Sequence, residues 1–307
     1  MDWYVIVSES HNPAWNLSLE ECILDRYTIL PQEAVVLLFY VNDRSIVIGK
    51  HQNPWLEVNW DCIQQRDPPL FRRISGGGTV YHDRGNLNFS FIQPRSLFSK
   101  EENLSLIQES LRNLGIEVSR TERGDLFYQN RKVSGNALCF RKDRVLHHGT
   151  LLIETDLQSL QHSLVVPSAF RGMFRSIAVP SVGSVTANLK DSFPFLSTSL
   201  MIQTVIEVLS SQGATIIRLE NPGIILQVEQ FQSILYRHEA WEWVFGATPT
   251  FWFNNNRGEP INNGEMSCKV EQGQIVEVRG SNEEERLLGQ PFDPLVISRV
   301  RENLIHR

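Results

Sequence analysis

Three consecutive glycines behind two arginines are the part of the chain whose residue types point most directly to chemistry. The run is Arg72-Arg73-Ile74-Ser75-Gly76-Gly77-Gly78-Thr79-Val80-Tyr81-His82-Asp83-Arg84-Gly85-Asn86. Because glycine has no Cβ, a ligand can approach the backbone N–H groups of such a segment closely. An arginine can hold a carboxylate or a phosphate through two parallel hydrogen bonds. The run therefore predicts a site for an anionic ligand.

The residues after the glycines predict strands and exclude two common phosphate-binding motifs. The apolar side chains between Val80 and Phe91 alternate as in an extended segment. A P-loop ends in Gly-Lys-Ser/Thr, but the Gly49-Lys50 pair precedes a histidine. A Rossmann motif needs a helix that begins at its last glycine, and no helix is expected here. Taken alone, the triple glycine leaves open a plain solvent loop.

Further blocks of sequence accompany the glycine run. Residues 131–137 are Arg-Lys-Val-Ser-Gly-Asn-Ala, and residues 147–152 are His-His-Gly-Thr-Leu-Leu. Earlier comes the block Val47-Ile48-Gly49-Lys50-His51-Gln52-Asn53-Pro54-Trp55, and later Trp241-Glu242-Trp243-Val244-Phe245-Gly246-Ala247-Thr248-Pro249-Thr250-Phe251. Together with Ser-Gly-Gly-Gly-Thr-Val-Tyr-His-Asp, these blocks resemble the lipoate–protein ligase family, including the closely similar lipoyltransferases. They follow one another in family order.

The resemblance implies an ATP-dependent ligase that forms an acyl adenylate. Lipoate and ATP, with Mg²⁺, would give lipoyl-AMP, and the lipoyl group would pass to a lysine of an apo lipoyl domain. The implied acceptors are the acyltransferase subunits of 2-oxoacid dehydrogenases and the glycine-cleavage H protein. One alternative stays open, a lipoyltransferase that takes preformed lipoyl-AMP or another lipoylated protein as donor without activating lipoate itself.

The resemblance also implies roles for individual residues. The matching lysine, Lys132, is the catalytic residue, and it contacts both the lipoate carboxylate and the nucleotide phosphate. The implied nucleotide-binding residues are Arg73, Gly78, Thr79, Val80, Tyr81 and Lys132. The implied lipoate-binding residues are Ser75, Gly76, Gly77, Lys132 and His148. Further candidates are Asn86, whose amide would reach the acyl adenylate, His82, and Asp125, which would lie near magnesium and the phosphates.

A lysine in this place has a simple physical reason. Joining a carboxylate to the α-phosphate of ATP brings two anions together, and a fixed cation offsets their repulsion in the transition state. No side-chain nucleophile is needed, because the enzyme supplies alignment, charge neutralisation and exclusion of water.

Three other classes of protein fit the sequence less well. An octanoyltransferase of similar fold works through a cysteine thioester, and that cysteine would be expected after the His-Gly segment at 147–152. No cysteine lies between Cys139 and Cys268. A biotin–protein ligase would carry a Gly-Arg-Gly-Arg type of loop, which is absent from the sequence. A non-catalytic relative that only binds lipoyl domains would have no use for the intact glycine run and Lys132.

Composition limits the remaining possibilities. A chain of 307 residues with 41% hydrophobic residues has room for a large domain and a small one. The net charge of −6 argues against nucleic acid as a principal partner. The longest apolar stretch, Ala34–Val41, is too short for a membrane helix, and the first residues resemble a strand, not a targeting peptide. Four scattered cysteines without a CxxC pair predict a reduced, cytoplasmic protein, and we expect a monomer without nucleic-acid or membrane partners.

The expected fold class is α+β, because strands occur in runs without strict alternation with helices. The expected helices cover 13–27, 60–65, 102–114, 196–212, 228–237 and 295–303. The expected strands cover 3–7, 34–41, 46–48, 127–128, 133–139, 148–153, 250–253, 266–270 and 275–278, with strands also flanking the glycines. Mixed sheets flanked by helices would form a catalytic domain of the biotin and lipoate ligase type over 1–245, and residues 246–307 a small β-rich accessory domain.

Residues 162–190 show no clear periodicity. A loop of this length inside a compact domain is usually functional or mobile. We therefore expect this segment to close over a bound adenylate.

Overall fold

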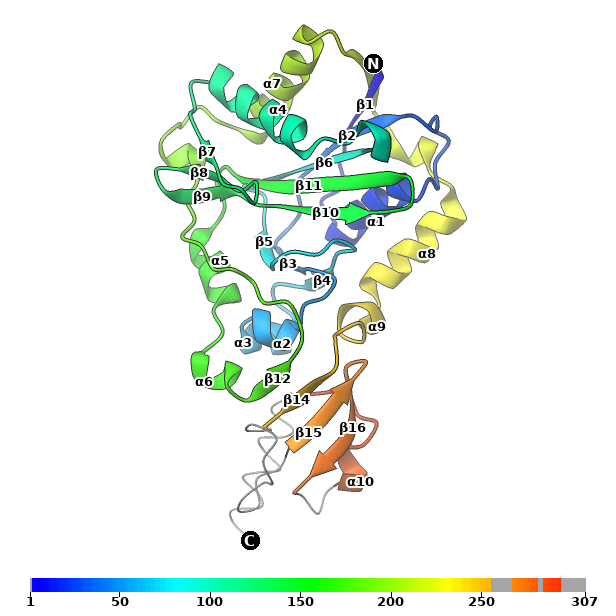
Figure 1. The fold of residues 1–307 in the computed structure, drawn as a ribbon, viewed down its shortest axis with the longest axis vertical. Coiled ribbons are helices and arrows are strands. Elements are labelled where there is room, and N and C mark those ends of the chain that lie inside the picture. The colour runs from blue at the N-terminus through cyan, green and yellow to red at the C-terminus, as the bar shows by residue number, and fades with distance from the viewer. Residues whose placement is uncertain (1, 255–266, 281–283, 294–307) are drawn as a thin grey trace.

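The computed structural model describes residues 2–254, 267–280 and 284–293 (Figure 1). Its centre is a six-stranded mixed sheet of order β10-β11-β6-β2-β1-β13. β1 pairs in parallel with both β2 and β13, and the remaining pairs are antiparallel. The six strands are β1 (Asp2–Val7), β2 (Val35–Tyr40), β6 (Asn86–Pro94), β10 (Asn136–Phe140), β11 (Arg144–Leu152) and β13 (Thr215–Leu219).

Helices cover both faces of this sheet, which explains why every residue of β2 is buried (Figure 1). Successive strand residues point to opposite faces, so Leu37 packs under α4 and α7 while Leu38 packs under α1 and α8. The four helices are α1 (Pro13–Leu24), α4 (Lys100–Asn113), α7 (Thr198–Ser211) and α8 (Val228–Glu239). The two resulting cores hold the central sheet rigid next to the glycine run and Lys132.

A small sheet anchors the glycine run at both of its ends. β3 (Ser45–Ile48) is the middle strand, with β4 (Leu70–Arg72) parallel on one side and β5 (Val80–His82) antiparallel on the other. The segment that connects β4 to β5, residues 73–79, is called the glycine loop below. Because both flanking strands pair with β3, the two ends of the loop are fixed relative to each other. The short helices α2 (Pro54–Glu57) and α3 (Trp60–Gln65) follow β3.

A third sheet is a meander that carries the candidate catalytic lysine. Its strands are β7 (Ser119–Arg120), β8 (Leu126–Tyr128) and β9 (Arg131–Ser134). The chain between residues 177 and 188, called the strap below, lies against β9. The N–H group of Lys132 donates to Val185 O at 2.8 Å, and Ala187 N–H donates to Lys132 O at 3.1 Å. The strap is thereby fastened beside Lys132.

The fourth sheet lies at one end of the elongated molecule (Figure 1). Its order is β12-β14-β15-β16, formed by β12 (Phe174–Ser176), β14 (Phe251–Phe253), β15 (Ser267–Glu271) and β16 (Gln274–Arg279). Trp55 of α2 is buried against Phe245, Phe251 and Phe292, with ring centroids 5.1–5.5 Å apart. This aromatic cluster joins the fourth sheet to the rest of the molecule.

The remaining elements are short. They are the helices α5 (Leu157–Leu164), α6 (Ser168–Arg171), α9 (Trp241–Val244) and α10 (Glu284–Leu287), and the 3₁₀ helices η1 (Arg95–Leu97), η2 (Leu189–Asp191) and η3 (Pro222–Ile225). Within the described residues, no helix combines the length and the apolar character that crossing a membrane requires.

The α+β class and most expected elements are confirmed, with some differences. Strand β13 was not expected, although Thr215, Ile216 and Ile217 favour a strand. Residues 162–190 contain α6, β12 and η2 as well as the end of α5, so they are not one irregular loop. The helix expected at 295–303 lies outside the described residues.

The division into 1–245 and 246–307 stays a prediction. The fourth sheet takes one strand, β12, from the first range and three from the second. A boundary at residue 245 therefore separates strands that share hydrogen bonds.

Candidate active site

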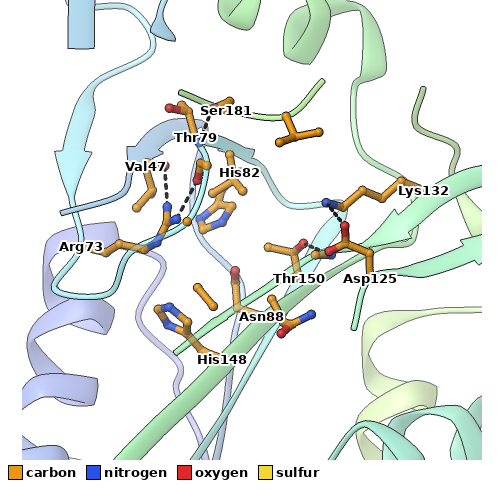
Figure 2. Close-up of a pocket in the computed structure, with 18 of the residues that line it drawn as sticks. Val47, Arg73, Thr79, His82, Asn88, Asp125, Lys132, His148, Thr150 and Ser181 are labelled. Carbon is orange, nitrogen blue, oxygen red and sulfur yellow. Dashed lines mark hydrogen bonds and ion pairs between the residues drawn. The ribbon is translucent and has the colours of Figure 1, made fainter. Parts of the chain in front are cut away.

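A cavity of about 320 Å³ lies between the glycine loop, β10, β11 and the strap (Figure 2). Arg73, Thr79 and His82 lie on one side of it, and Lys132 and Asp125 lie on the other (Figure 2). The expected site residues that line it are Arg73, Gly77, Gly78, Thr79, Val80, His82, Asp125, Lys132 and His148. Segments far apart in the sequence thus meet in one space.

The glycine loop wraps around its own arginine. The Arg73 guanidinium donates to Val47 O at 3.0 Å, to Gly76 O at 2.7 Å and to Gly78 O at 2.6 Å. Burial lowers the pKa of Arg73 to about 10, so the side chain remains a cation at neutral pH. Gly77 has φ of +85°, in the region that favours glycine. The loop is therefore shaped from inside by a buried positive charge, with its backbone facing the cavity.

Arg72 points the other way, as expected for neighbouring residues of a strand. It is fully buried and donates to Gln52 O at 2.8 Å, Val244 O at 2.7 Å and Thr248 Oγ1 at 2.9 Å. These bonds tie the block at residues 241–251 to the chain before α2. Arg72 is therefore a structural residue in this fold.

Lys132 lies at the other wall of the cavity, where an ion pair fixes its side chain. Its Nζ lies 2.9 Å from Asp125 Oδ2, and both side chains are about a quarter exposed, at 24% and 21%. A Cβ on Gly135 would lie 3.0 Å from Lys132 Cε and 3.1 Å from its Nζ. The glycine of the Val-Ser-Gly motif thus leaves the space in which the lysine side chain lies.

His148 belongs to a buried polar cluster beneath the cavity. Its Nε2 lies 2.7 Å from Ser75 Oγ, and its Nδ1 lies 3.0 Å from Glu20 Oε1. Glu20 also accepts a hydrogen bond from Tyr40 Oη at 3.1 Å and one from Ser90 Oγ. Burial alone would raise the pKa of Glu20, but His148 and these donors lower it below its usual value. The carboxylate is therefore ionised at neutral pH.

Glu20 was not expected from the sequence. The sequence does offer one indication of its role, a charged residue within the helix α1. The neighbours Leu19, Cys22 and Ile23 are all buried. A buried glutamate needs a partner, but the sequence does not show that the partner is His148, which lies 128 residues away.

The strap contributes a second unexpected residue, Ser181. Its Oγ accepts a hydrogen bond from Thr79 N–H at 2.9 Å and one from Gln52 Nε2 at 3.0 Å. Its own N–H lies 3.2 Å from Glu57 Oε2. Ser181 thus occupies a backbone donor of the glycine loop that the resemblance assigns to a nucleotide. No sequence signal distinguishes this serine from others in the segment.

Four expected site residues do not line the cavity. Ser75 lies behind His148, and the carbonyl of Gly76 is turned to Arg73. Tyr81 faces an adjoining cavity of about 610 Å³, which shares Thr79, Val80, Lys132, Gly135 and Thr150 with the first. Asn86 is fully buried and donates to Asn88 Oδ1 at 3.2 Å, so that Asn88 lines the cavity in its place.

Comparison with known proteins identifies the family. Residues 12–214 match the family model described as the lipoyl protein ligase A/B catalytic domain. The chain belongs to this family. The match covers all the expected site residues, and the expectation of a ligase from this family is confirmed.

Relatives and solved structures agree with this family. The chain is 31% identical over 323 residues to the Mycoplasma pneumoniae protein named "Probable lipoate-protein ligase A", covering 99% of this chain and 92% of that protein. A structure of lipoate–protein ligase A bound with ATP is 26% identical, with a TM-score of 0.64, over 79% of this chain and 98% of that one. A bipartite lipoate–protein ligase from Thermoplasma acidophilum, studied with its E2 lipoyl domain, is 25% identical with a TM-score of 0.64, over 80% and 96%. The expected ligase-like fold is confirmed.

Acid should weaken the fold through two buried histidines. Burial, together with the nearby charges of Arg73 and His148, lowers the pKa of His82 to about 3. Burial, together with the nearby charges of His148 and Lys100, lowers the pKa of His147 to about 3. Between pH 6.5 and pH 3 the unfolded chain binds protons that the folded chain does not. The free energy of unfolding should therefore fall with falling pH, by up to about 1.4 kcal/mol per pH unit for each histidine.

Urea unfolding at a series of pH values from 7 to 4 measures this dependence. The variant His147→Gln should show a shallower slope than the wild type, because one of the two groups no longer titrates. Glu20, whose pKa is lowered in the folded state, adds a loss in the same direction once the pH falls below its unfolded value of about 4.5. Equal stability at pH 7 and pH 4 would contradict the neutral, buried state of both rings.

Proposed function

We propose that this chain is a lipoate–protein ligase that activates lipoate with ATP and transfers the lipoyl group to a protein lysine. The observation that carries the proposal is the juxtaposition of Lys132, the backbone of residues 77–79 and the buried Arg73 cation around one cavity. Two positive charges face each other across a space of the right kind for a carboxylate and a phosphate. The names of the relatives support lipoate and ATP as the ligands.

Neither of the two chemical steps requires a nucleophile from this protein. In the first, a lipoate carboxylate oxygen forms a bond to the α-phosphorus of ATP, and the bond to pyrophosphate breaks. In the second, a lysine amine attacks the acyl carbonyl, AMP leaves, and the amine loses a proton. Lys132 would exchange its bond to Asp125 for the ligand oxygens and so offset the negative charge that accumulates in the first step.

The walls of the two cavities suggest how the adenylate would lie. Leu17, Val47 and Ala137 offer apolar surface to an aliphatic chain in the first cavity. The adjoining cavity, reached past Thr79, Val80 and Lys132, has room for the nucleotide. The acyl-phosphate group would then lie where the two cavities meet, beside Lys132. Ser181 would have to leave Thr79 N–H for the phosphate to bind there.

We expect Mg²⁺ to be held mainly by the substrate phosphates. Among the described residues, no cluster of three His, Cys, Asp or Glu side chains could hold an ion. Mg²⁺ is commonly held by one or two carboxylates together with substrate phosphates. Asp125, at the wall beside Lys132, is the carboxylate that fits this role, and a bound ion would supply further neutralisation of phosphate charge.

The acceptor would be a lysine on a small apo lipoyl domain. The acyltransferase subunits of 2-oxoacid dehydrogenases and the glycine-cleavage H protein carry such domains, and the related Thermoplasma ligase was studied with one. The acceptor amine must reach the acyl carbonyl near Lys132, so the partner would dock on the rim formed by the strap and β9. We expect the ligase to act there as a monomer.

One assay separates this function from transfer alone. Purified protein is incubated with an apo lipoyl domain and either ATP, Mg²⁺ and lipoate or preformed lipoyl-AMP. We expect mass spectrometry to show one lipoyl addition, at a single lysine of the domain, in both mixtures. Addition only from lipoyl-AMP would make the protein a lipoyltransferase. Equal modification of free lysine or of random surface lysines would contradict a dedicated protein acceptor.

A further inference from the structure

His82 reaches the cavity with one ring nitrogen that has no partner in the described part of the chain. Its Nδ1 lies 3.0 Å from Asn42 Nδ2, whereas its Nε2 is buried and forms no hydrogen bond with any described residue. The side chain is 3% exposed and lines the cavity between Arg73 and Asn88 (Figure 2). A buried polar atom without a partner is costly unless a ligand satisfies it.

A series of hydrogen-bonded side-chain amides fixes which nitrogen of His82 carries the proton. The series begins at Ser10 O, a backbone carbonyl that can only accept, so the atom 2.9 Å from it must be the amide nitrogen of Asn16. That same nitrogen donates to Asn42 Oδ1 at 2.8 Å, and Ser8 Oγ donates to Asn16 Oδ1 at 2.7 Å. Asn42 must therefore turn its NH₂ group toward His82. His82 Nδ1 accepts, and the proton of the neutral ring is on Nε2.

The same arrangement recurs at the opposite wall. Gln93 Nε2 donates to the carbonyl of Leu97 at 2.7 Å, so Gln93 Oε1 accepts from Asn103 Nδ2 at 3.0 Å. Asn103 Nδ2 faces His147 Nδ1 at 3.3 Å, which leaves the proton of that ring on Nε2, 3.3 Å from Asn136 Oδ1. The NH₂ group of Asn136 is then directed away from His147. It is buried at the cavity wall and has no partner among the described residues.

We infer that Asn42 and Asn16 are positioning residues that hold His82 as a neutral Nε2–H donor to an oxygen of the bound acyl adenylate. The NH₂ group of Asn136 is a second donor to the same ligand. The inference rests on the proposed function and deepens it. Both donors are uncharged, so they can bind carbonyl or phosphate oxygens without adding charge beside Arg73. A relay of amides anchored on a backbone carbonyl keeps each donor oriented before the ligand arrives, which lowers the cost of ordering the site.

The tautomer of His82 is measurable by ¹⁵N NMR of the ring nitrogens, in the wild type without ligand. We expect a protonated Nε2 and an unprotonated Nδ1. On addition of lipoyl-AMP, the Nε2–H resonance should shift, because it gains an acceptor. A ring protonated on Nδ1, or an Nε2–H resonance that does not respond to bound lipoyl-AMP, would overturn the inference.

The variant Asn42→Asp reverses the relay with little change in shape. A carboxylate accepts only, so it should draw the proton of His82 to Nδ1 and leave Nε2 as an acceptor toward the cavity. We expect the affinity for lipoyl-AMP, measured by calorimetry, to fall about tenfold, the size of one hydrogen bond. The matched control is Asn53→Asp, another fully buried asparagine, whose side chain accepts from Trp55 N–H, forms no hydrogen bond with a histidine among the described residues and lines neither cavity. It should bind lipoyl-AMP like the wild type.

Two outcomes separate this inference from the proposed function. If the wild type binds lipoyl-AMP but Asn42→Asp binds equally well with its tautomer reversed, the donor role is wrong and the ligase proposal stands. If the wild type binds no lipoyl-AMP, the ligase proposal fails. The variant His82→Phe, which keeps a ring and removes both nitrogens, should lose affinity as Asn42→Asp does, and unchanged affinity there would also overturn the donor role.

Discussion

Replacing Lys132 by alanine is expected to lower the rate of adenylate formation by about 100-fold or more. The lysine is the cation at the wall where the acyl-phosphate group would lie, and removing one preorganised charge from such a site costs about 2.7 kcal/mol or more of transition-state stabilisation. The fold should survive. Asp125 loses its partner, but its side chain is 21% exposed, so water can solvate the carboxylate, and the loss of stability should stay within about 1 kcal/mol.

The measurement is ATP–pyrophosphate exchange in the presence of lipoate, together with thermal unfolding. Lys269→Ala is the matched control, because Lys269 forms an ion pair with Glu271 at 2.6 Å on β15, in the fourth sheet. That variant should exchange pyrophosphate like the wild type. A folded Lys132→Ala protein that keeps more than about a tenth of the activity, a loss under about 1.4 kcal/mol, would show that the lysine is not central.

Local patterns predicted the parts of the fold that depend on local physics. The alternation around the glycine loop predicted β5 and β6. The helix expected from residue 13 is α1, and the Asn12 side chain caps its start by accepting from Ala14 N–H at 2.8 Å. Strand β13 was missed because its residues are exposed or half-buried at the edge of the sheet, and its partner β1 is more than 200 residues away. Strand order and sheet membership of this kind depend on packing between distant segments.

The candidate site shows the same limit. Sequence motifs predicted that the residues of the glycine loop and Lys132 belong to the site, because glycine and arginine have specific uses at an anion site. They did not name Glu20, Ser181 or Asn42, whose roles come from partners between 40 and 128 residues away. They also placed Asn86 in the site, whereas its side chain is fully buried, donates to Asn88 Oδ1 and does not line the cavity. A single sequence shows a polar residue but not the group that satisfies it.

Placing valine at Gly77 is expected to abolish binding of lipoyl-AMP. Gly77 has φ of +85°, which a β-branched residue adopts only with strain of about 1–3 kcal/mol. A Cβ there would also lie 3.0 Å from Arg73 Nη2 and 3.4 Å from Ala137 Cβ. The added methyl groups would push against the guanidinium that shapes the loop and against the opposite wall of the cavity. We expect the affinity measured by calorimetry to fall by at least about 100-fold, or about 2.7 kcal/mol.

Gly213→Val separates backbone strain from obstruction of the cavity. Gly213 has φ of +83° and open space where its Cβ would lie, and it follows α7 on the far side of the sheet. This variant should lose stability to a similar degree, because the backbone strain is alike, yet it should bind lipoyl-AMP with wild-type affinity. If a folded Gly77→Val protein bound as tightly as Gly213→Val, the glycine loop would not be the surface that holds the ligand.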